Sequence, residues 1–100
     1  MISFRKENNS VICTPKVNLV ASNVSVMRDR LLAKLEGQEW VELIVDCNEV
    51  DTLDAIGVNL LVGLHKKAET SGGTFKMIGC NDALKKVLNL FRLDQKFSVE

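Results

Sequence analysis

Apolar residues along this chain follow two spacings, one typical of buried strands and one typical of helices. A nearly continuous aliphatic run at Val41 and 43–45 predicts a strand covered by helices on both faces. It stops at 46–48, an Asp-Cys-Asn sequence of the kind that favours turns. After a loop over 49–53, apolar residues recur at helical spacing at Ile56, Leu60, Leu61, Leu64 and Ala68. The stretch 41–64 is therefore predicted to form a strand, an acidic loop and a helix.

Similar patterns before and after this stretch predict the other elements. Strands are expected at 2–7, at 11–14 up to the single proline, at 74–79 and, as a short last strand, at 97–99. A continuation of the second strand over 16–20 is left open. One further helix is expected over 23–36, with Ser22 or Asn23 as its N-cap and Gly37 as its stop. The last helix follows Asn81, and its apolar face is Leu84, Val87, Leu88 and Phe91.

The order of these elements indicates the fold class. Repeated strand–helix–strand units with short connections imply parallel neighbouring strands and right-handed crossovers. We therefore expect a single α/β domain over 1–100, with a mixed sheet of four or five strands and about three helices. The ring of Trp40, just before the central strand, should cover an edge of the core.

Charge and hydropathy exclude two broad classes of protein. The chain has 13 basic and 13 acidic residues, and the basic residues form no stripe, so direct binding to nucleic acid is not expected. No apolar run approaches the roughly 20 residues that cross a bilayer, and the first residues lack the apolar core of a signal peptide. We therefore expect a cytoplasmic protein that does not insert into membranes.

The residues on which enzymes and metal sites depend are sparse. His65 is the only histidine and lies inside the central helix beside a lysine pair, which favours a partly exposed surface residue. The chain has no nucleophile elbow and no phosphate-binding loop. Four carboxylates around the acidic loop do not have the spacing of a calcium site: Asp46, Glu49, Asp51 and Asp54. The sequence therefore favours a non-enzymatic protein without a cofactor or bound metal.

Three cysteines are widely spaced and include no C-x-x-C pair. Cys47 and Cys80 each follow a predicted strand, and Cys13 lies within one. We expect all three to be small buried residues in a reducing compartment, and neither a disulfide framework nor a zinc site.

The start of the central helix is the most informative position in the chain. Asp54 comes just before the apolar periodicity, where its carboxylate can accept backbone N–H groups and oppose the positive end of the helix dipole. A capping role and a binding role are both open, and they are compatible. A hydroxyl at the next position would carry a phosphate of about −1.5 to −2 charge at the helix N-terminus. Ala55 stands there instead.

These residues resemble the STAS domain, the fold of bacterial anti-sigma factor antagonists. That family has an aliphatic strand, an acidic loop and Asp-Ser-x-Gly at the start of a leucine-rich helix. Here the passage reads LIVDCNEVDTLDAIGVNLLVGL. The later passages HKKAETSGGTFKMIGC and NDALKKVLNLFRLDQKFSVE are also similar to the family, so the resemblance covers about 11–99. It implies a STAS-like domain.

The resemblance also implies a partner and a switch. Such domains bind an anti-sigma factor that is also a serine kinase, of the GHKL type, and phosphorylation of the serine after the aspartate ends the binding. In this chain Ala55 replaces that phosphoacceptor, while the aspartate and glycine of the motif are kept. The expected partner-binding residues lie around the helix start: Val20, Leu53, Asp54, Ile56 and Gly57.

Departures from the family pattern leave alternatives open. With alanine at the switch, the protein is a permanently competent binder, is controlled elsewhere, or carries an alanine engineered from serine. Thr52 and Ser71 have hydroxyls, but neither occupies the motif position. Ile56 either enlarges an apolar contact surface or packs inward, and we favour inward packing. Of the early Gly-x-Leu-Asp passage of the family, residues 17–20 keep only the leucine.

Two other roles are compatible with the resemblance. STAS-like proteins also serve as small cytoplasmic adaptor subunits of membrane lipid ABC transporters, a role that needs no phosphoacceptor. Nucleotide binding, as in some relatives, has no loop motif to support it here. The sequence does not set the oligomeric state.

Overall fold

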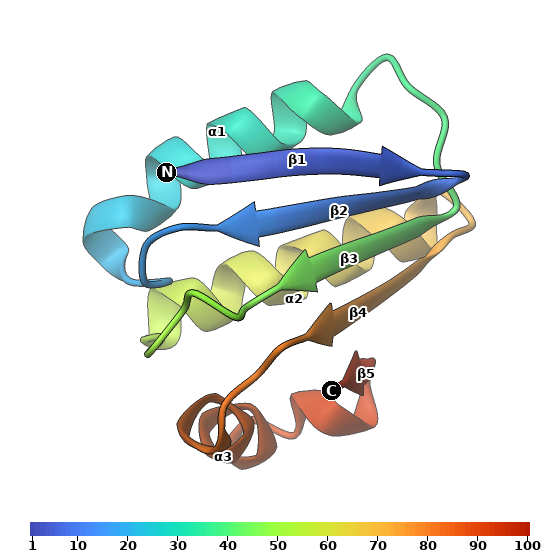
Figure 1. Ribbon diagram of the computed structural model, residues 1–100. Coiled ribbons are helices and arrows are strands. Elements are labelled where there is room, and N and C mark those ends of the chain that lie inside the picture. Colours follow the sequence, from blue (N-terminus) through green and yellow to red (C-terminus); the bar gives the residue numbers. More distant parts are fainter.

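The fold is a five-stranded sheet with its helices on one face and one edge (Figure 1). The computed structural model describes all residues, 1–100. Its elements are β1 (Ile2–Glu7), β2 (Ser10–Pro15), α1 (Ala21–Leu35), β3 (Glu42–Asp46), α2 (Ala55–Thr70), β4 (Thr74–Ile78), α3 (Asp82–Leu90), the 3-10 helix η1 (Leu93–Gln95) and β5 (Ser98–Val99). The sheet order is β1-β2-β3-β4-β5, with β1 and β2 antiparallel and the other neighbours parallel. This confirms the predicted α/β class.

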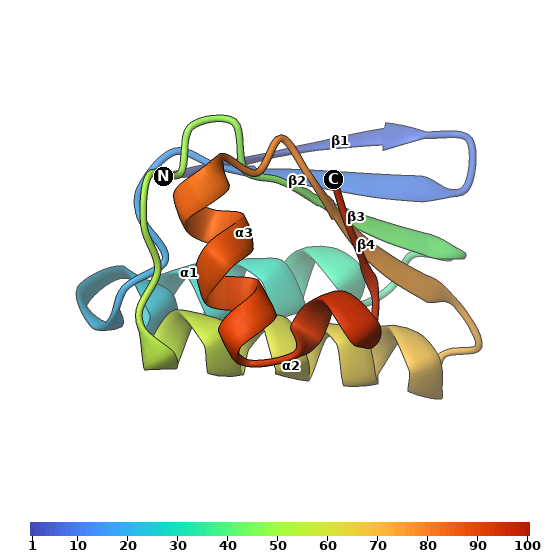
Figure 2. The ribbon, with the colours of Figure 1, turned by 90° about the horizontal axis from the view of Figure 1, so that it is seen from below.

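Both long helices pack on the same face of the sheet. Figure 2 shows α1 and α2 side by side beneath the strands, with α3 and η1 at the edge beside β4. Two rows of side chains share the helix-facing side of the sheet: Val11, Leu43 and Phe75, and Cys13, Val45 and Met77. All six are at most 5% exposed and belong to a core of 25 buried residues. Burying a valine, leucine or phenylalanine contributes about 1.5–3 kcal/mol, so this layer holds the helices to the sheet.

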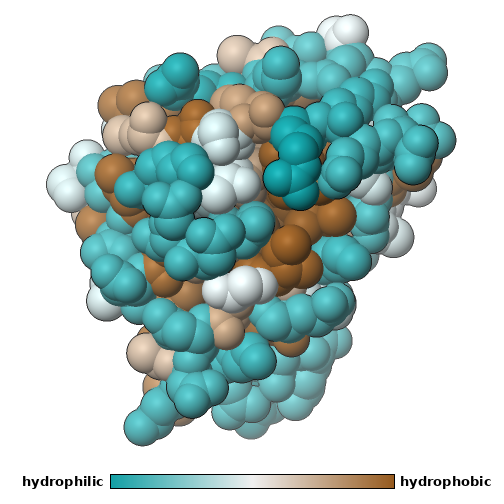
Figure 3. All heavy atoms as spheres, viewed as in Figure 1, coloured by the Kyte–Doolittle hydropathy of each residue, from teal (hydrophilic) through white to brown (hydrophobic).

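The opposite face of the sheet carries no helix, which corrects the prediction that the central strand is covered on both faces. Ile12 and Ile44 pair across β2 and β3 and point to this face, outside the main core. They are nevertheless only 5% and 7% exposed. Lys76 is the β4 partner of Ile44, and its ammonium group pairs with Glu42 at 3.9 Å across the same face. Polar side chains with long aliphatic stems take the place of a second helix layer, and Figure 3 shows hydrophilic side chains on this face with hydrophobic areas between them.

The start of α1 also differs from the prediction. The helix begins at Ala21, two residues early, and Val20 precedes it without a side-chain cap. The predicted N-cap residues 22–23 lie inside the first turn. The other end is confirmed, because Gly37 follows the cap residue with a φ of 75°, a left-handed conformation that glycine adopts easily.

The remaining boundaries agree closely with the pattern. Asn81 caps α3 by accepting a hydrogen bond from the Leu84 N–H at 2.8 Å, as expected. Trp40 is partly buried and packs against the core, also as expected, but Val41 is 56% exposed and precedes β3. Residues 16–20 do not extend β2. No helix in the structure has the length and apolar character needed to span a bilayer.

Candidate functional site

The loops that precede α1 and α2 lie side by side at the carboxyl ends of parallel strands, the edge where α/β sheets commonly bind ligands. Leu19 and Leu53 pair there as an isolated parallel bridge. The Leu19 N–H donates to the carbonyl of Thr52 at 3.2 Å, and the Asp54 N–H donates to the carbonyl of Leu19 at 3.2 Å. These two bonds hold the N-terminal ends of the two helices next to each other.

Asn18 strengthens this contact between the loops. Its side-chain oxygen accepts hydrogen bonds from the N–H groups of Asp51 and Thr52 at 2.8 and 3.2 Å. Its carbonyl accepts a hydrogen bond from the side chain of Asn23 at 2.9 Å, which explains why Asn23 lies in the first turn and does not cap the helix. Sequence reasoning did not single out Asn18. Its only signal was a polar residue within an apolar passage.

The carboxylate of Asp54 caps both helices. One oxygen accepts a hydrogen bond from the Gly57 N–H at 2.9 Å, which confirms the predicted cap of α2. The other accepts from the Ala21 N–H, also at 2.9 Å, which places the start of α1 at that residue. The N–H group of Gly57, and then that of Ala21, lower the pKa of the Asp54 carboxyl below its usual range. One negative charge therefore faces the positive ends of two helix dipoles.

Gly57 serves close packing. A Cβ at this position would overlap the carbonyl oxygen of Leu19 and lie 2.9 Å from its carbonyl carbon. The first turn of α2 therefore lies against the loop before α1 at a distance that only glycine permits. Gly57 is buried. It therefore acts on the junction by setting the distance between α2 and the loop before α1, and not by direct contact with a partner.

The switch position and one predicted partner-binding residue, Ile56, are on the surface of this junction, whereas Leu53 and Gly57 lie beneath it. Ala55, the first residue of α2, is exposed, and Ile56 is 43% exposed. The prediction that Ile56 packs inward is therefore wrong. Leu53, by contrast, is only 8% exposed because it pairs with the loop before α1 and belongs to the core. Val20 is half-buried next to the junction.

The carboxylates of the acidic loop do not converge on a common centre. Asp46 accepts two hydrogen bonds from Asn48, at 3.1 and 2.9 Å. Glu49 pairs with the ammonium group of Lys16 at 2.5 Å on the surface. No three of the His, Cys, Asp and Glu side chains gather in an arrangement that could hold a metal ion.

The comparison with known families decides where this fold belongs. The family model described as STAS domain matches residues 1–100. The chain belongs to the STAS domain family. A curated protein of Thermotoga maritima, named "Putative anti-sigma factor antagonist", is 21% identical over 95 residues, which make up 95% of this chain and 84% of that protein.

Solved structures of similar fold bear related names. A crystal structure from Thermotoga maritima with the same description has a TM-score of 0.91 at 19% identity, covering 98% of this STAS domain and 84% of that chain. The anti-sigma factor antagonist SpoIIAA in its unphosphorylated form has a TM-score of 0.83 at 15% identity, covering 100% and 88%. At these identities the structural likeness establishes the fold.

The other hydroxyls considered for a switch lie outside the motif position of this STAS domain. Thr52 is exposed in the loop before α2, and Ser71 is exposed beyond the C-terminal end of that helix. They are separated by the whole length of α2, so only Thr52 is near the junction.

His65 is partly exposed, in agreement with the prediction. Its side chain is 15% exposed and lies beside the rings of Phe75 and Phe97, with centroid distances of 6.3 and 5.3 Å. Those two phenylalanine rings meet edge to face at 4.7 Å. The histidine is thus part of an aromatic cluster near β5, far along α2 from the junction.

All three cysteines are buried, as expected, and each is a free thiol in this structure. Burial raises the pKa of the Cys13 thiol to about 12. A hydrogen bond between Cys47 and Cys80, together with burial, raises the pKa of Cys47, while the same hydrogen bond lowers the pKa of Cys80. The two cysteines lie just after the ends of β3 and β4, and Cys47 comes directly before the acidic loop.

Proposed function

We propose that this STAS domain is a non-enzymatic regulatory protein of the anti-sigma factor antagonist type. It acts in the cytoplasm and binds an anti-sigma factor that is a serine kinase of the GHKL type, through the helix start at 54–57. The observation that carries the proposal is the exposed Ala55 beside a carboxylate that caps two helices. The names of the relatives support the class of partner.

The contact surface of this proposal is small and largely apolar. Ala55 and Ile56 present methyl groups to solvent, and the half-buried Val20 flanks them. Leu53 and Gly57 act from beneath, by fixing the distance between the two loops. A phosphate at position 55 would add a charge of about −1.5 to −2 next to the Asp54 carboxylate and so disfavour an apolar or acidic contact. Because alanine cannot be phosphorylated, the domain is a permanently competent binder.

The decisive test is the variant Ala55→Glu, measured against the anti-sigma factor recovered by pull-down from the native cells. We expect the dissociation constant to rise at least about tenfold, since the added charge imitates the phosphorylated state. The fold should be retained, because an acidic residue in the first turn interacts favourably with the helix dipole.

Ala83→Glu is the matched control, because Ala83 is also exposed in the first turn of a helix, α3. It should leave the affinity unchanged. Equal affinities of the wild-type protein and Ala55→Glu would exclude the junction as the interface.

A second variant tests the switch itself. Ala55→Ser restores the hydroxyl of the motif, and incubation with the kinase and ATP should add one phosphate to this variant and none to the wild-type protein. Intact-mass spectrometry reads the result directly. Phosphate on Thr52 of the wild-type protein would instead place the regulatory phosphorylation site in the loop just before α2.

The adaptor role in a lipid ABC transporter is not favoured, because the relatives described above are named as antagonists. The same pull-down decides this point. Recovery of transporter subunits without an anti-sigma factor would assign the protein to the adaptor class.

A further inference from the structure

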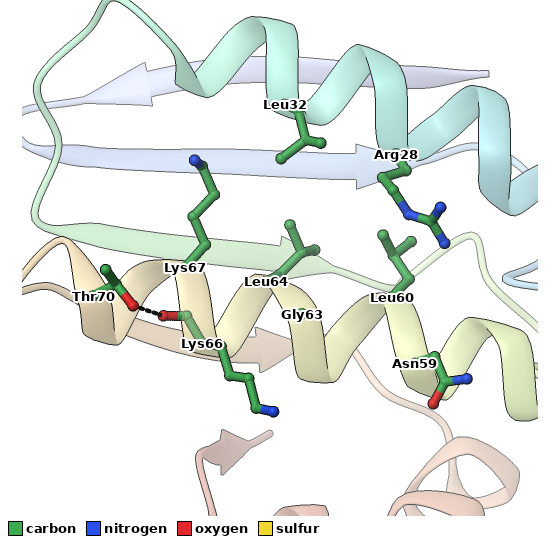
Figure 4. A pocket seen from close by; sticks show the side chains of 9 residues that line it. All are labelled: Arg28, Leu32, Asn59, Leu60, Gly63, Leu64, Lys66, Lys67 and Thr70. Carbon is green, nitrogen blue, oxygen red and sulfur yellow. Dashed lines mark hydrogen bonds between the residues drawn. The ribbon is translucent and has the colours of Figure 1, made fainter.

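The outer surface of the helix pair carries a groove of about 420 Å³. Leu32 of α1 and Leu60 and Leu64 of α2 form its floor, and Figure 4 shows these side chains between the two helices. The groove lies along α2 and reaches Thr70, the last residue of the helix. It faces away from the sheet and is separate from the junction at 54–57.

The rim of this groove is positively charged. Arg28 comes from α1, and Lys66 and Lys67 come from α2. Figure 4 shows Arg28 and Lys67 on either side of the leucine floor. None of the three takes part in an ion pair, and no acidic residue lines the groove. In a chain with a formal net charge of +0, this is a local excess of positive charge without a partner.

Gly63 of α2 also lines the groove and has no side chain to cover the helix backbone there. A Cβ at this position would meet nothing within 4 Å, so the packing of this chain does not require a glycine there. Glycine inside a helix is unfavourable relative to alanine. Its presence lets another chain approach the backbone of α2 closely.

We propose that this groove docks an acidic amphipathic helix of a partner protein. Its apolar side chains would lie on the leucine floor, while its aspartate and glutamate side chains would face Arg28, Lys66 and Lys67. A depression between two helices that lie side by side suits a third helix packed on both. This surface is independent of the proposed function, since none of the residues that line the groove belongs to the junction at 54–57.

Charge should dominate the affinity. Leu60 and Leu64 are only 4% and 3% exposed, so docking removes little further apolar area from water. Exposed charges attract over about 10 Å at 0.1 M salt and over less at higher salt. Binding should therefore be salt-sensitive and should discriminate strongly by the sign of charge on the ligand.

The probe is a fluorescein-labelled peptide of about 20 residues, with leucines at i, i+3, i+4 and i+7 and glutamates at its flanking positions. A matched peptide has lysine in place of every glutamate. Fluorescence anisotropy with the full chain should show saturable binding of the acidic peptide, weakened severalfold by raising the NaCl concentration, and no binding of the basic one. Amide NMR shifts should place the acidic peptide on Gly63 and its neighbours.

Two double variants and one single variant locate the site. Arg28→Glu/Lys67→Glu should weaken binding at least tenfold, and Lys85→Glu/Lys86→Glu, the same change in charge on α3, should alter it less than twofold. Gly63→Leu should also abolish binding while preserving the fold, because it fills open space on a helix.

Several results would overturn the proposal. These are equal losses in both double variants, equal affinity for the two peptides, or no binding of the acidic peptide. Binding of sodium decanoate without binding of the peptide would also overturn it, and would assign the groove to a small anionic amphiphile.

Discussion

Replacing Gly57 by alanine tests the geometry of the junction most directly. The new methyl group would overlap the carbonyl oxygen of Leu19 and come within 2.9 Å of its carbonyl carbon. Both atoms belong to the backbone, so the clash cannot be relieved by rotating a side chain. Either α2 moves away from the loop before α1, or that loop is displaced from the junction.

The expected cost follows from three contributions. An extra methyl group in a packed site costs about 1–3 kcal/mol. Moving Leu19 weakens its two backbone hydrogen bonds, to Thr52 and from Asp54, each worth about 0.5–1.5 kcal/mol. The higher helix propensity of alanine offsets this loss of stability by about 1 kcal/mol at most. The net loss in the free energy of unfolding is therefore about 3 kcal/mol, a large part of the stability of a small domain.

Gly63→Ala is the matched control in the same helix. Since a Cβ at Gly63 meets open space, only the propensity term acts, and the variant should be more stable by about 0.5–1 kcal/mol. Urea unfolding followed by the fluorescence of Trp40, the only tryptophan, and by far-UV circular dichroism measures both changes. The thermal midpoint of Gly57→Ala should fall by at least about 10 °C. Equal stabilities of the two alanine variants would refute the close approach at Leu19.

Two further predictions concern titratable groups. The pKa of Asp54 is lower in the folded state, so its charge stabilises the fold above about pH 4 and this contribution is lost as the pH falls through the lowered value. Asp54→Asn should therefore reduce the difference in urea midpoint between pH 7 and pH 3, and an unchanged difference would contradict the double cap. Iodoacetamide labelling followed by peptide mass spectrometry should modify Cys80 before Cys13 and Cys47, because the pKa of Cys80 is lowered while those of the other two thiols are raised. Labelling of Cys13 or Cys47 before Cys80 would contradict this prediction.

Local signals in the sequence were sufficient to predict helix starts wherever the capping residue and the N–H group that donates to it lie within one helical turn. Asp54 caps the N–H of Gly57, and Asn81 caps that of Leu84, each three residues away. Such contacts depend on the local chain alone, so the starts of α2 and α3 were predicted correctly. The strands of the sheet were predicted for a related reason, since runs of aliphatic residues favour interior strands.

Predictions failed where the partner came from a distant part of the chain. The cap of α1 is supplied by Asp54, 33 residues beyond Ala21, so local rules placed the helix start two residues late. The inward packing expected of Ile56 was also wrong. Leu53, which pairs with Leu19, is in the core, whereas Ile56 is 43% exposed.

The sequence by itself determined the class of fold, the order of its elements, the junction at 54–57 and the absence of a hydroxyl at position 55. These depend on residue type and on spacing along the chain. Only the tertiary structure decided that one carboxylate caps two helices and that Gly57 is needed for contact with Leu19. It also decided that a groove with a positively charged rim lies between α1 and α2. The physical reason is that each of these features joins residues whose separation in sequence carries no information about their distance in space.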